Sequence, residues 1–229
     1  LSIIQSESIS NLQVVSENDE LLGIVTLSNL TEGYMDIWDD NILGRSNTPL
    51  ENIVEVMRGE INLEPENPRS FSGRMTVYAM EPKSVSDNIQ EKDVVIVGNR
   101  EDAQEDAIKK GVSMLILTIG SVISKENLEL ARKNNVTVIT TELDTFLAAR
   151  LLPLAVPVEY VMTKKNLVKF KDDDFVDDIK VIMGNTRYRS YPIVDNKNQV
   201  VGSIARYHLI SNKKKPLILV DHNEKNQSV

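Results

Sequence analysis

The sequence predicts an α/β protein in which a repeated unit is interrupted by a second, inserted α/β domain. Two observations carry this expectation. Residues 9–30, ISNLQVVSENDELLGIVTLSNL, align without gaps on residues 188–209, YRSYPIVDNKNQVVGSIARYHL. Between these copies, short apolar segments alternate with segments of helical pattern, which is typical of a parallel sheet with crossover helices.

The repeat is recognised from its pattern of residue types. Each copy has a β-branched strand, a polar turn, a second strand around a glycine and then a helix start. The second copy is more complete, because Val161-Met-Thr163 begins it and residues 167–170 and 175–183 predict a strand and an amphipathic helix. The first copy lacks that opening strand and most of that helix, so we expect either that the natural protein continues upstream of Leu1 or that residues are absent from this sequence.

The inserted domain is predicted from strands and helices in alternation. The strands fall at residues 94–97, 114–118 and 136–140, and the helices at residues 102–110, 126–133 and 144–152. Prolines bracket this segment, as they do many domain boundaries: Pro65, Pro68, Pro153 and Pro157. Ahead of it, Thr48-Pro-Leu-Glu51 has the form of a capping box, with proline at the first position of a helix over residues 50–58.

These signals divide the chain into four parts. Residues 1–64 form the first repeat with its following helices, 65–157 the insert, 158–212 the second repeat, and 213–229 a terminal segment.

Composition excludes several classes of function. The formal net charge of −8 argues against a nucleic-acid partner, because duplex binding needs a broad positive field. There are no cysteines, so disulfides, thiolate metal sites and cysteine nucleophiles are excluded. The longest apolar stretches are far shorter than the ~20 residues of a membrane helix. We expect a cytoplasmic protein with no membrane partner.

Specific motifs in both parts resemble known domain families. The repeat resembles CBS domains through Val161-Met-Thr163, Tyr191-Pro-Ile-Val-Asp195 and Gly23-Ile-Val-Thr-Leu-Ser-Asn29, the last of which fits the family's adenosine-nucleotide signature. The insert resembles a DRTGG domain through residues 94–102 and 115–120, although Asn99 and Ile119 depart from that family's pattern. The resemblance implies paired CBS repeats, a Bateman-type module, with an inserted α/β DRTGG domain.

The C-terminal segment resembles a third family. Leu219-Val-Asp-His-Asn-Glu224 is similar to the second metal-binding motif of family II inorganic pyrophosphatases, one branch of which carries CBS and DRTGG domains as an insertion. The resemblance implies that Asp221 is a manganese (Mn2+) ligand in the intact hydrolase. The chain has only two histidines, and one motif cannot assemble a two-metal centre, so we expect no hydrolysis by this segment alone.

The CBS resemblance implies a nucleotide cleft that draws on both repeats. Backbone N–H groups at the helix start after Thr26 suit an anion. Asn29 suits ribose hydroxyls, Tyr188 offers a flat ring for adenine, and Arg189 offers a fork for phosphate. The full set of expected nucleotide-binding residues is Ser10, Thr26, Leu27, Ser28, Asn29, Thr163, Val168, Tyr188, Arg189 and Ser190.

Structural interpretations of the same residues stay open. Tyr188 could pack on the edge of the core, Arg189 could be a solvated charge, and Thr26 and Asn29 could be ordinary capping residues. Gly98-Asn-Arg-Glu101 resembles a phosphate loop but lacks the Lys-Ser/Thr pair, which favours a plain turn.

The second cleft differs from the first at two positions. Ala205 stands where the first copy has the Thr26 hydroxyl, and His208 stands where it has Asn29. We therefore expect one competent nucleotide site per chain.

The leading hypothesis is a regulatory region of an inorganic pyrophosphatase. The family implies AMP and ADP as inhibitors, ATP or diadenosine polyphosphates as activators, and a homodimer. Two rival hypotheses are a dimerisation scaffold that binds no nucleotide, and an enzyme fragment with residual hydrolase activity built on Asp221 and His222.

Overall fold

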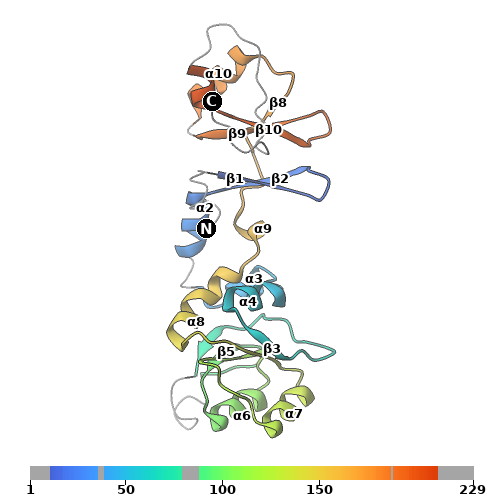
Figure 1. Ribbon diagram of the computed structural model, residues 1–229, viewed down its shortest axis with the longest axis vertical. Helices are drawn as coiled ribbons and strands as arrows, with labels where there is room; N and C mark the ends of the chain where they lie inside the picture. Colours follow the sequence, from blue (N-terminus) through green and yellow to red (C-terminus); the bar gives the residue numbers. More distant parts are fainter. Residues whose placement is uncertain (1–10, 36–38, 79–87, 187, 211–229) are drawn as a thin grey trace, which may run out of the picture. The chain divides into compact units, whose positions relative to one another are not determined.

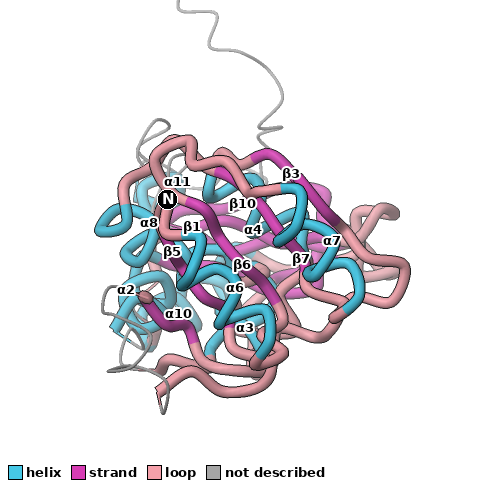
Figure 2. The backbone as a smooth tube through the Cα atoms, turned by 90° about the horizontal axis from the view of Figure 1, so that it is seen from below, coloured by secondary structure: helices cyan, strands magenta, loops and turns pink. Residues whose placement is uncertain are grey.

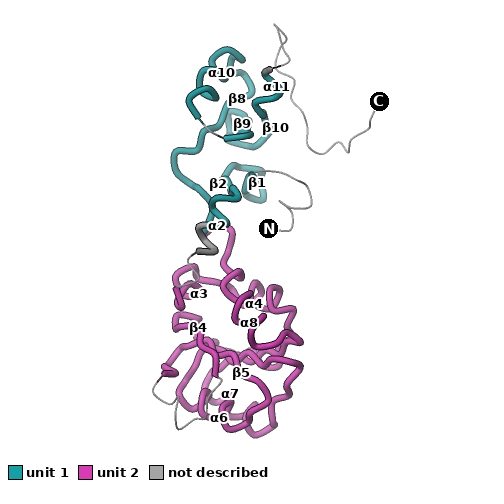
Figure 3. The backbone as a smooth tube through the Cα atoms, turned by 90° about the vertical axis from the view of Figure 1, so that its left-hand side faces the viewer, with its two compact units in different colours: residues 1–32, 161–229 teal, residues 33–160 magenta. Residues whose placement is uncertain are grey.

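The computed structural model describes residues 11–35, 39–78, 88–186 and 188–210 of the chain. The chain divides into two compact units, as Figure 3 shows: unit 1 comprises residues 1–32 and 161–229, and unit 2 comprises residues 33–160. Unit 1 therefore contains both copies of the repeat. None of the described helices has the length and apolar character that a membrane span requires.

The first repeat of unit 1 is a β-hairpin followed by a helix (Figure 1). β1 (Asn11–Val15) pairs antiparallel with β2 (Leu21–Thr26), and α2 (Leu27–Met35) begins directly after β2. Asp19, with φ of 60°, supplies the left-handed backbone that the turn between the strands uses. Buried and more accessible residues alternate along β2, as expected for a strand with one face on a core.

The second repeat has the same hairpin and helix, preceded by one more strand and helix. β8 (Phe170–Lys171) and α10 (Val176–Asn185) precede the hairpin of β9 (Ser190–Val194) and β10 (Val200–Ala205), which leads into α11 (Arg206–Ile210). The sheet order is β10-β9-β8, with β8 parallel to β9. The buried residues of this core are Phe170, Ile179, Met183, Tyr191, Ile193 and Ile204.

The gapless alignment of the two repeat copies is confirmed by the structure. β1 and β9, β2 and β10, and the starts of α2 and α11 are all 179 residues apart in the chain. Equivalent atoms also meet: the Leu21 N–H donates to the Asn198 carbonyl at 3.0 Å, and the Val200 N–H donates to the Asp19 carbonyl at 2.8 Å. These reciprocal bonds relate the two hairpins by a local twofold.

Unit 2 contains a five-stranded sheet with the order β3-β7-β6-β5-β4. β4 (Met75–Val77), β5 (Val94–Val97), β6 (Met114–Leu117) and β7 (Thr137–Thr140) are parallel, and β3 (Glu60–Leu63) is antiparallel at one edge. The predicted parallel sheet with crossover helices is therefore confirmed. β5 and β6 are buried along their whole length, which explains their continuous apolar runs.

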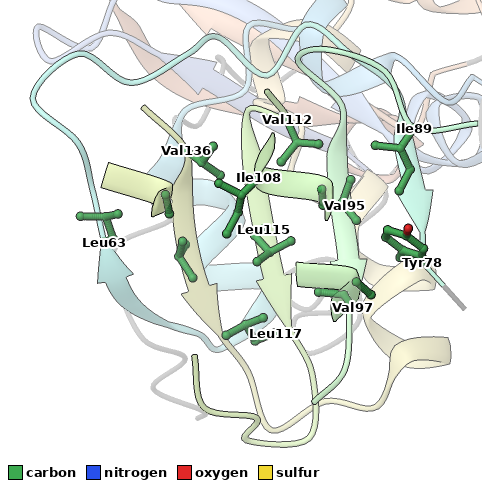
Figure 4. Close-up of a cluster of buried hydrophobic side chains, with 14 residues drawn as sticks. Leu63, Tyr78, Ile89, Val95, Val97, Ile108, Val112, Leu115, Leu117 and Val136 are labelled. Carbon is green, nitrogen blue, oxygen red and sulfur yellow. The ribbon is translucent and has the colours of Figure 1, made fainter. Parts of the chain in front are cut away.

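Helices cover both faces of this sheet. α6 (Glu101–Lys109) and α7 (Lys125–Lys133) lie over one face, onto which Figure 2 looks. Figure 4 shows the apolar side chains between them and the strands, among them Ile108, Leu115 and Val136. The opposite face packs against the remaining helices of the unit, which are α3 (Ile42–Arg45), α4 (Leu50–Met57), α8 (Thr145–Leu151) and the 3-10 helix η2 (Leu152–Ala155), followed by α9 (Val158–Val161).

Unit 2 begins ahead of the predicted boundary at residue 65. Residues 33–64 belong to it because Ile42, Ile53 and Met57 pack in one buried cluster with residues of the sheet such as Ile116. β3 also pairs with β7, which fixes the segment to the sheet edge.

Two local predictions were wrong. The Thr48-Pro-Leu-Glu51 segment is not a capping box, because α4 begins at Leu50 after an extended Pro49 and has no side-chain cap; the Thr48 hydroxyl lies 2.6 Å from Ser46 Oγ instead. The strand expected over residues 167–170 is confined to β8, because pairing with β9 begins only at Phe170.

Candidate functional site

A groove in unit 1 is built from both repeats and has a cavity volume of about 30 Å³. The first repeat contributes residues from both strands of its hairpin, β1 and β2. The second repeat contributes the loop before β8 and residues at the start of β9. The lining residues are Asn11, Ile24, Thr26, Thr163, Asn166, Leu167, Val168, Tyr188 and Ser190.

Five of the expected nucleotide-binding residues line this groove: Thr26, Thr163, Val168, Tyr188 and Ser190. Three more, Leu27, Ser28 and Asn29, form the start of α2 directly after Thr26. Arg189 is exposed beside Tyr188. Ser10 and Asp221 lie outside the described residues, so their roles stay predictions, as do the ligand contacts of the whole set.

Sequence reasoning missed four lining residues, which are Asn11, Ile24, Asn166 and Leu167. Asn11 lies directly opposite Thr26 in the hairpin, so the register of the two strands could have identified it. Asn166 and Leu167 lie in the segment between two expected residues, Thr163 and Val168. No sequence signal separates them from an ordinary loop.

The side chain of Asn29 makes three hydrogen bonds. Its Oδ1 accepts from the Thr26 backbone N–H at 2.9 Å and from the Thr26 hydroxyl at 2.8 Å. Its Nδ2 donates to Thr163 Oγ1 at 3.2 Å. The amide oxygen is therefore fully used by the helix start, and only one hydrogen of the amide nitrogen remains for a ligand. The expectation that Asn29 suits ribose hydroxyls is thereby limited to one N–H donor.

Thr163 is fixed in the groove by its backbone. The Ile24 N–H donates to the Thr163 carbonyl at 3.0 Å, and the Thr163 N–H donates to the Ile24 carbonyl at 2.9 Å. Gly23 permits this approach, because a Cβ there would lie 2.6 Å from Met162 Sδ and 2.9 Å from the Thr163 carbonyl oxygen. The glycine of the signature therefore brings Thr163 against β2.

Asn11 and Ser190 join the two repeats beside the groove. Asn11 Nδ2 donates to the Ser190 carbonyl at 2.9 Å, and the Ser190 hydroxyl donates to Asn11 Oδ1 at 2.5 Å. The two residues occupy equivalent positions of the repeat, so they meet on the local twofold.

Tyr188 lies at the end of a row of aromatic rings. Its ring meets Tyr191 edge-on, with the centroids 5.8 Å apart, and Tyr191 in turn contacts Phe170 at 5.3 Å. Tyr191 and Phe170 are buried, whereas 46% of Tyr188 is exposed. The ring therefore rests on the core and still presents surface to a planar ligand.

The second copy of the helix start has a different set of atoms. The Ala205 N–H donates to His208 Nδ1 at 3.1 Å, which is the equivalent of the bond from Thr26 to Asn29. The hydroxyl of Thr26 has no counterpart at Ala205. The second copy therefore keeps the cap but loses a polar group that a ligand could use.

The described residues contain no group of three or more histidine, aspartate or glutamate side chains placed to hold a metal ion. Asp221 and His222, on which the predicted metal motif depends, lie outside them.

Unit 2 has a larger groove and a separate polar cluster. The groove, of about 470 Å³, lies between β4 and α8, and none of its lining residues belongs to the expected nucleotide-binding set. In the cluster, Tyr78 donates to Asp106 at 2.6 Å and Lys110 pairs with the same carboxylate at 2.7 Å. Burial and this hydrogen bond raise the pKa of Tyr78. Burial alone would raise the pKa of Asp106, but its bonds from Lys110 and Tyr78 lower it.

The segment Gly98-Asn-Arg-Glu101 forms a strand-to-helix turn. Arg100 precedes α6 and pairs with Asp102 at 2.7 Å, and Gln104 Nε2 donates to the Gly98 carbonyl at 3.0 Å. The Arg100 side chain is therefore engaged by the first turn of α6.

Family models match both units. A CBS domain matches residues 1–36 and 158–215, and a DRTGG domain matches residues 52–155. The chain is 48% identical over 228 residues to a cobalt-dependent inorganic pyrophosphatase of Clostridium perfringens, and 30% identical over 226 residues to a probable manganese-dependent inorganic pyrophosphatase of Thermotoga maritima. It spans 42% and 41% of the lengths of these relatives.

A solved structure matches nearly all of the chain. It is the crystal structure of the CBS and DRTGG domains of the regulatory region of the Clostridium perfringens pyrophosphatase, complexed with the activator diadenosine tetraphosphate. The TM-score is 0.85 at 46% identity, and the match covers 90% of this chain and 89% of the other.

Proposed function

The chain belongs to the CBS and DRTGG domain families, and on that premise we propose that it is the adenine-nucleotide-binding regulatory region of an inorganic pyrophosphatase. Its relatives are metal-dependent pyrophosphatases, of which it spans about two fifths. In this proposal the regulated activity would reside in the rest of a longer protein.

The observation that carries this proposal is the groove between the repeats. It combines a half-exposed aromatic ring, Tyr188, with hydroxyl and amide groups on Thr26, Thr163 and Asn11. Adenine would stack on Tyr188, and the ribose and phosphate would meet the polar groups at the start of α2. Arg189, exposed beside the ring, would pair with phosphate oxygens.

The segment between Thr163 and Phe170 lines the groove through Asn166, Leu167 and Val168. Its residues Lys164 and Lys165 are exposed, and of this segment only Phe170 belongs to the buried core.

AMP and ADP act as inhibitors in this proposal, and ATP or diadenosine polyphosphates act as activators. The two classes of ligand favour different arrangements of the module, with a coupling of typically ~1–3 kcal/mol. In a homodimer two such grooves come from two chains. A ligand with two adenosines would bind the second groove at high effective concentration after occupying the first.

The intact protein would hold Mn2+ or another divalent metal, with Asp221 among the ligands, and would act in the cytoplasm. The bound metal would supply Lewis-acid activation of water and phosphate. This chain alone would not hydrolyse pyrophosphate.

Calorimetry with AMP tests the proposal. The unaltered chain should bind, and Tyr188→Ala should bind about 5- to 150-fold more weakly, because base stacking contributes roughly 1–3 kcal/mol. Tyr207→Ala is the matched control, since Tyr207 is a more exposed tyrosine outside the groove. Absence of heat with AMP and with diadenosine tetraphosphate would establish a non-binding scaffold instead.

A phosphate-release assay tests the remaining alternative. The chain is incubated with pyrophosphate and Mn2+ or Co2+. Metal-dependent release that is lost on Asp221→Ala would show that the chain is a hydrolase fragment and would contradict the regulatory assignment.

A further inference from the structure

Arg206 stands at the start of α11, where the first repeat has Leu27. Its side chain turns back over the loop that follows α10. Nη2 donates to the Met183 carbonyl at 2.6 Å and to the Thr186 carbonyl, and Nε donates to the Tyr188 carbonyl at 3.3 Å. One guanidinium thus contacts three backbone carbonyls of the segment that carries Tyr188.

Of these carbonyls, that of Met183 lies in the last turn of α10 and needs a donor from outside the helix. α10 ends at Asn185, and the last carbonyls of a helix have no intrahelical partner. Thr186 Oγ1 donates to the Ile182 carbonyl at 3.0 Å, and Arg206 donates to the Met183 and Thr186 carbonyls. A planar guanidinium with several donors can do this from one position, whereas a lysine ammonium cannot match the same spread of acceptors.

The contacts fix Tyr188 at both ends. Its ring rests edge-on against the buried Tyr191, and its backbone is bonded to Arg206. The backbone N–H of Arg206 also donates to the Arg189 carbonyl at 3.4 Å, so the residue after Tyr188 is bonded to the same helix start.

We infer that Arg206 is a positioning residue for the nucleotide groove: it holds the loop that presents the Tyr188 ring and the Arg189 guanidinium. This inference rests on the proposed function, because it assigns a role in that same site. It also assigns a role to the start of α11, the helix that follows the hairpin of the second repeat. In the second copy this position supports the groove formed with the first copy, while in the first copy the equivalent Leu27 is 54% exposed.

A double-mutant cycle measured by AMP calorimetry tests the inference. Arg206→Ala should weaken AMP binding about tenfold, and Arg206→Lys should resemble it because the fork is lost. Because Arg206 acts through the loop that carries Tyr188, the double variant with Tyr188→Ala should lose less affinity than the product of the two single losses. Losses that multiply would overturn the inference, since Arg206 would then act on the ligand independently. Lys180→Ala is the control, because it removes a cation from α10 that contacts only Asp177 among the described residues.

Tryptic cleavage after Arg189 gives a second measurement that needs no nucleotide. Arg206→Ala and Arg206→Lys should both be cleaved there several-fold faster than the unaltered chain, with folding checked by circular dichroism. An unchanged cleavage rate would overturn the inference whatever AMP does. Faster cleavage in a chain that binds no adenine nucleotide would refute the proposed function and leave the loop-holding role intact.

Discussion

The two repeats of unit 1 have the same backbone and different chemistry. Their hairpins and helix starts coincide at a constant separation of 179 residues, and reciprocal hydrogen bonds join them. At the helix start, however, Thr26 and Asn29 of the first copy are replaced by Ala205 and His208 in the second. The fold therefore accepts two different pairs of residues at the helix start, of which only the first pair suits the proposed nucleotide.

Each solution is consistent within itself. Asn29 Oδ1 has two lone pairs and accepts both the N–H and the hydroxyl of Thr26. His208 Nδ1 has one lone pair and accepts only the N–H of Ala205, so a hydroxyl at that residue would have no acceptor there. Both copies therefore cap the helix start, and the first copy leaves one hydrogen of Asn29 Nδ2 and one lone pair of the Thr26 hydroxyl for recognition.

The largest effect is expected from the glycine of the first copy. Gly23→Ala places a methyl group 2.6 Å from Met162 Sδ and 2.9 Å from the Thr163 carbonyl oxygen, which forces Thr163 away from β2. We expect a loss of about 1–3 kcal/mol in the free energy of unfolding, together with weaker AMP binding. Chemical denaturation and calorimetry measure the two effects.

Gly184→Ala is the control for this substitution. A Cβ at Gly184 meets no atom within 4 Å, and the residue lies inside α10, so alanine there should stabilise the protein by roughly 0.5–1 kcal/mol. Equal effects at the two glycines would show that the close approach of Thr163 to β2 is unimportant.

The next effect compares the two caps directly. Asn29→Ala and His208→Ala should each destabilise the protein by about 1 kcal/mol, because each removes the acceptor for a backbone N–H at a helix start. Only Asn29→Ala also removes a bond to Thr163, so only that variant should weaken AMP binding.

Thermal unfolding and AMP calorimetry on both variants test this difference. If His208→Ala weakened AMP binding as much as Asn29→Ala, the competent groove would have been assigned to the wrong repeat.

Much of this arrangement could be predicted from the sequence, because the repeat is encoded locally. Alternating apolar residues, a polar turn and a helix start recur at a fixed separation, and β5 was predicted with its bounds as observed. The groove residues Thr26, Thr163 and Tyr188 also followed from motifs.

Contacts between segments could not be predicted. Asn11 meets Ser190 because the two hairpins pack about a local twofold, and Arg206 meets the loop after α10 because α11 packs beside α10 within the second repeat. A side chain's partner across such an interface depends on the packing of the folded unit, which a single sequence does not specify. The same holds for Ile42 and Ile53, whose place in unit 2 follows from burial against its sheet.

The contact between Asn11 and Ser190 on the local twofold should make a smaller contribution to stability. Asn11→Ala should cost about 1 kcal/mol of unfolding free energy, since it removes both bonds to Ser190. Ser190→Ala removes only the hydroxyl bond and should cost less. Denaturation of the two single variants and the double variant measures their coupling, and strictly additive losses would contradict a direct interaction between the copies.

The smallest effect is expected when the second copy is made more like the first. Ala205→Ser should change stability by less than about 0.5 kcal/mol and leave AMP binding unchanged, because His208 Nδ1 already accepts the Ala205 N–H and has no second lone pair. The double variant Ala205→Thr with His208→Asn restores the acceptor and should be more stable than Ala205→Thr alone. Chemical denaturation of the three variants measures this. The gain from Ala205→Thr to the double variant is the reference. If Ala205→Ser alone raised stability or AMP affinity by as much as this gain, the pairing of residue types at positions 205 and 208 would not explain the difference between the repeats.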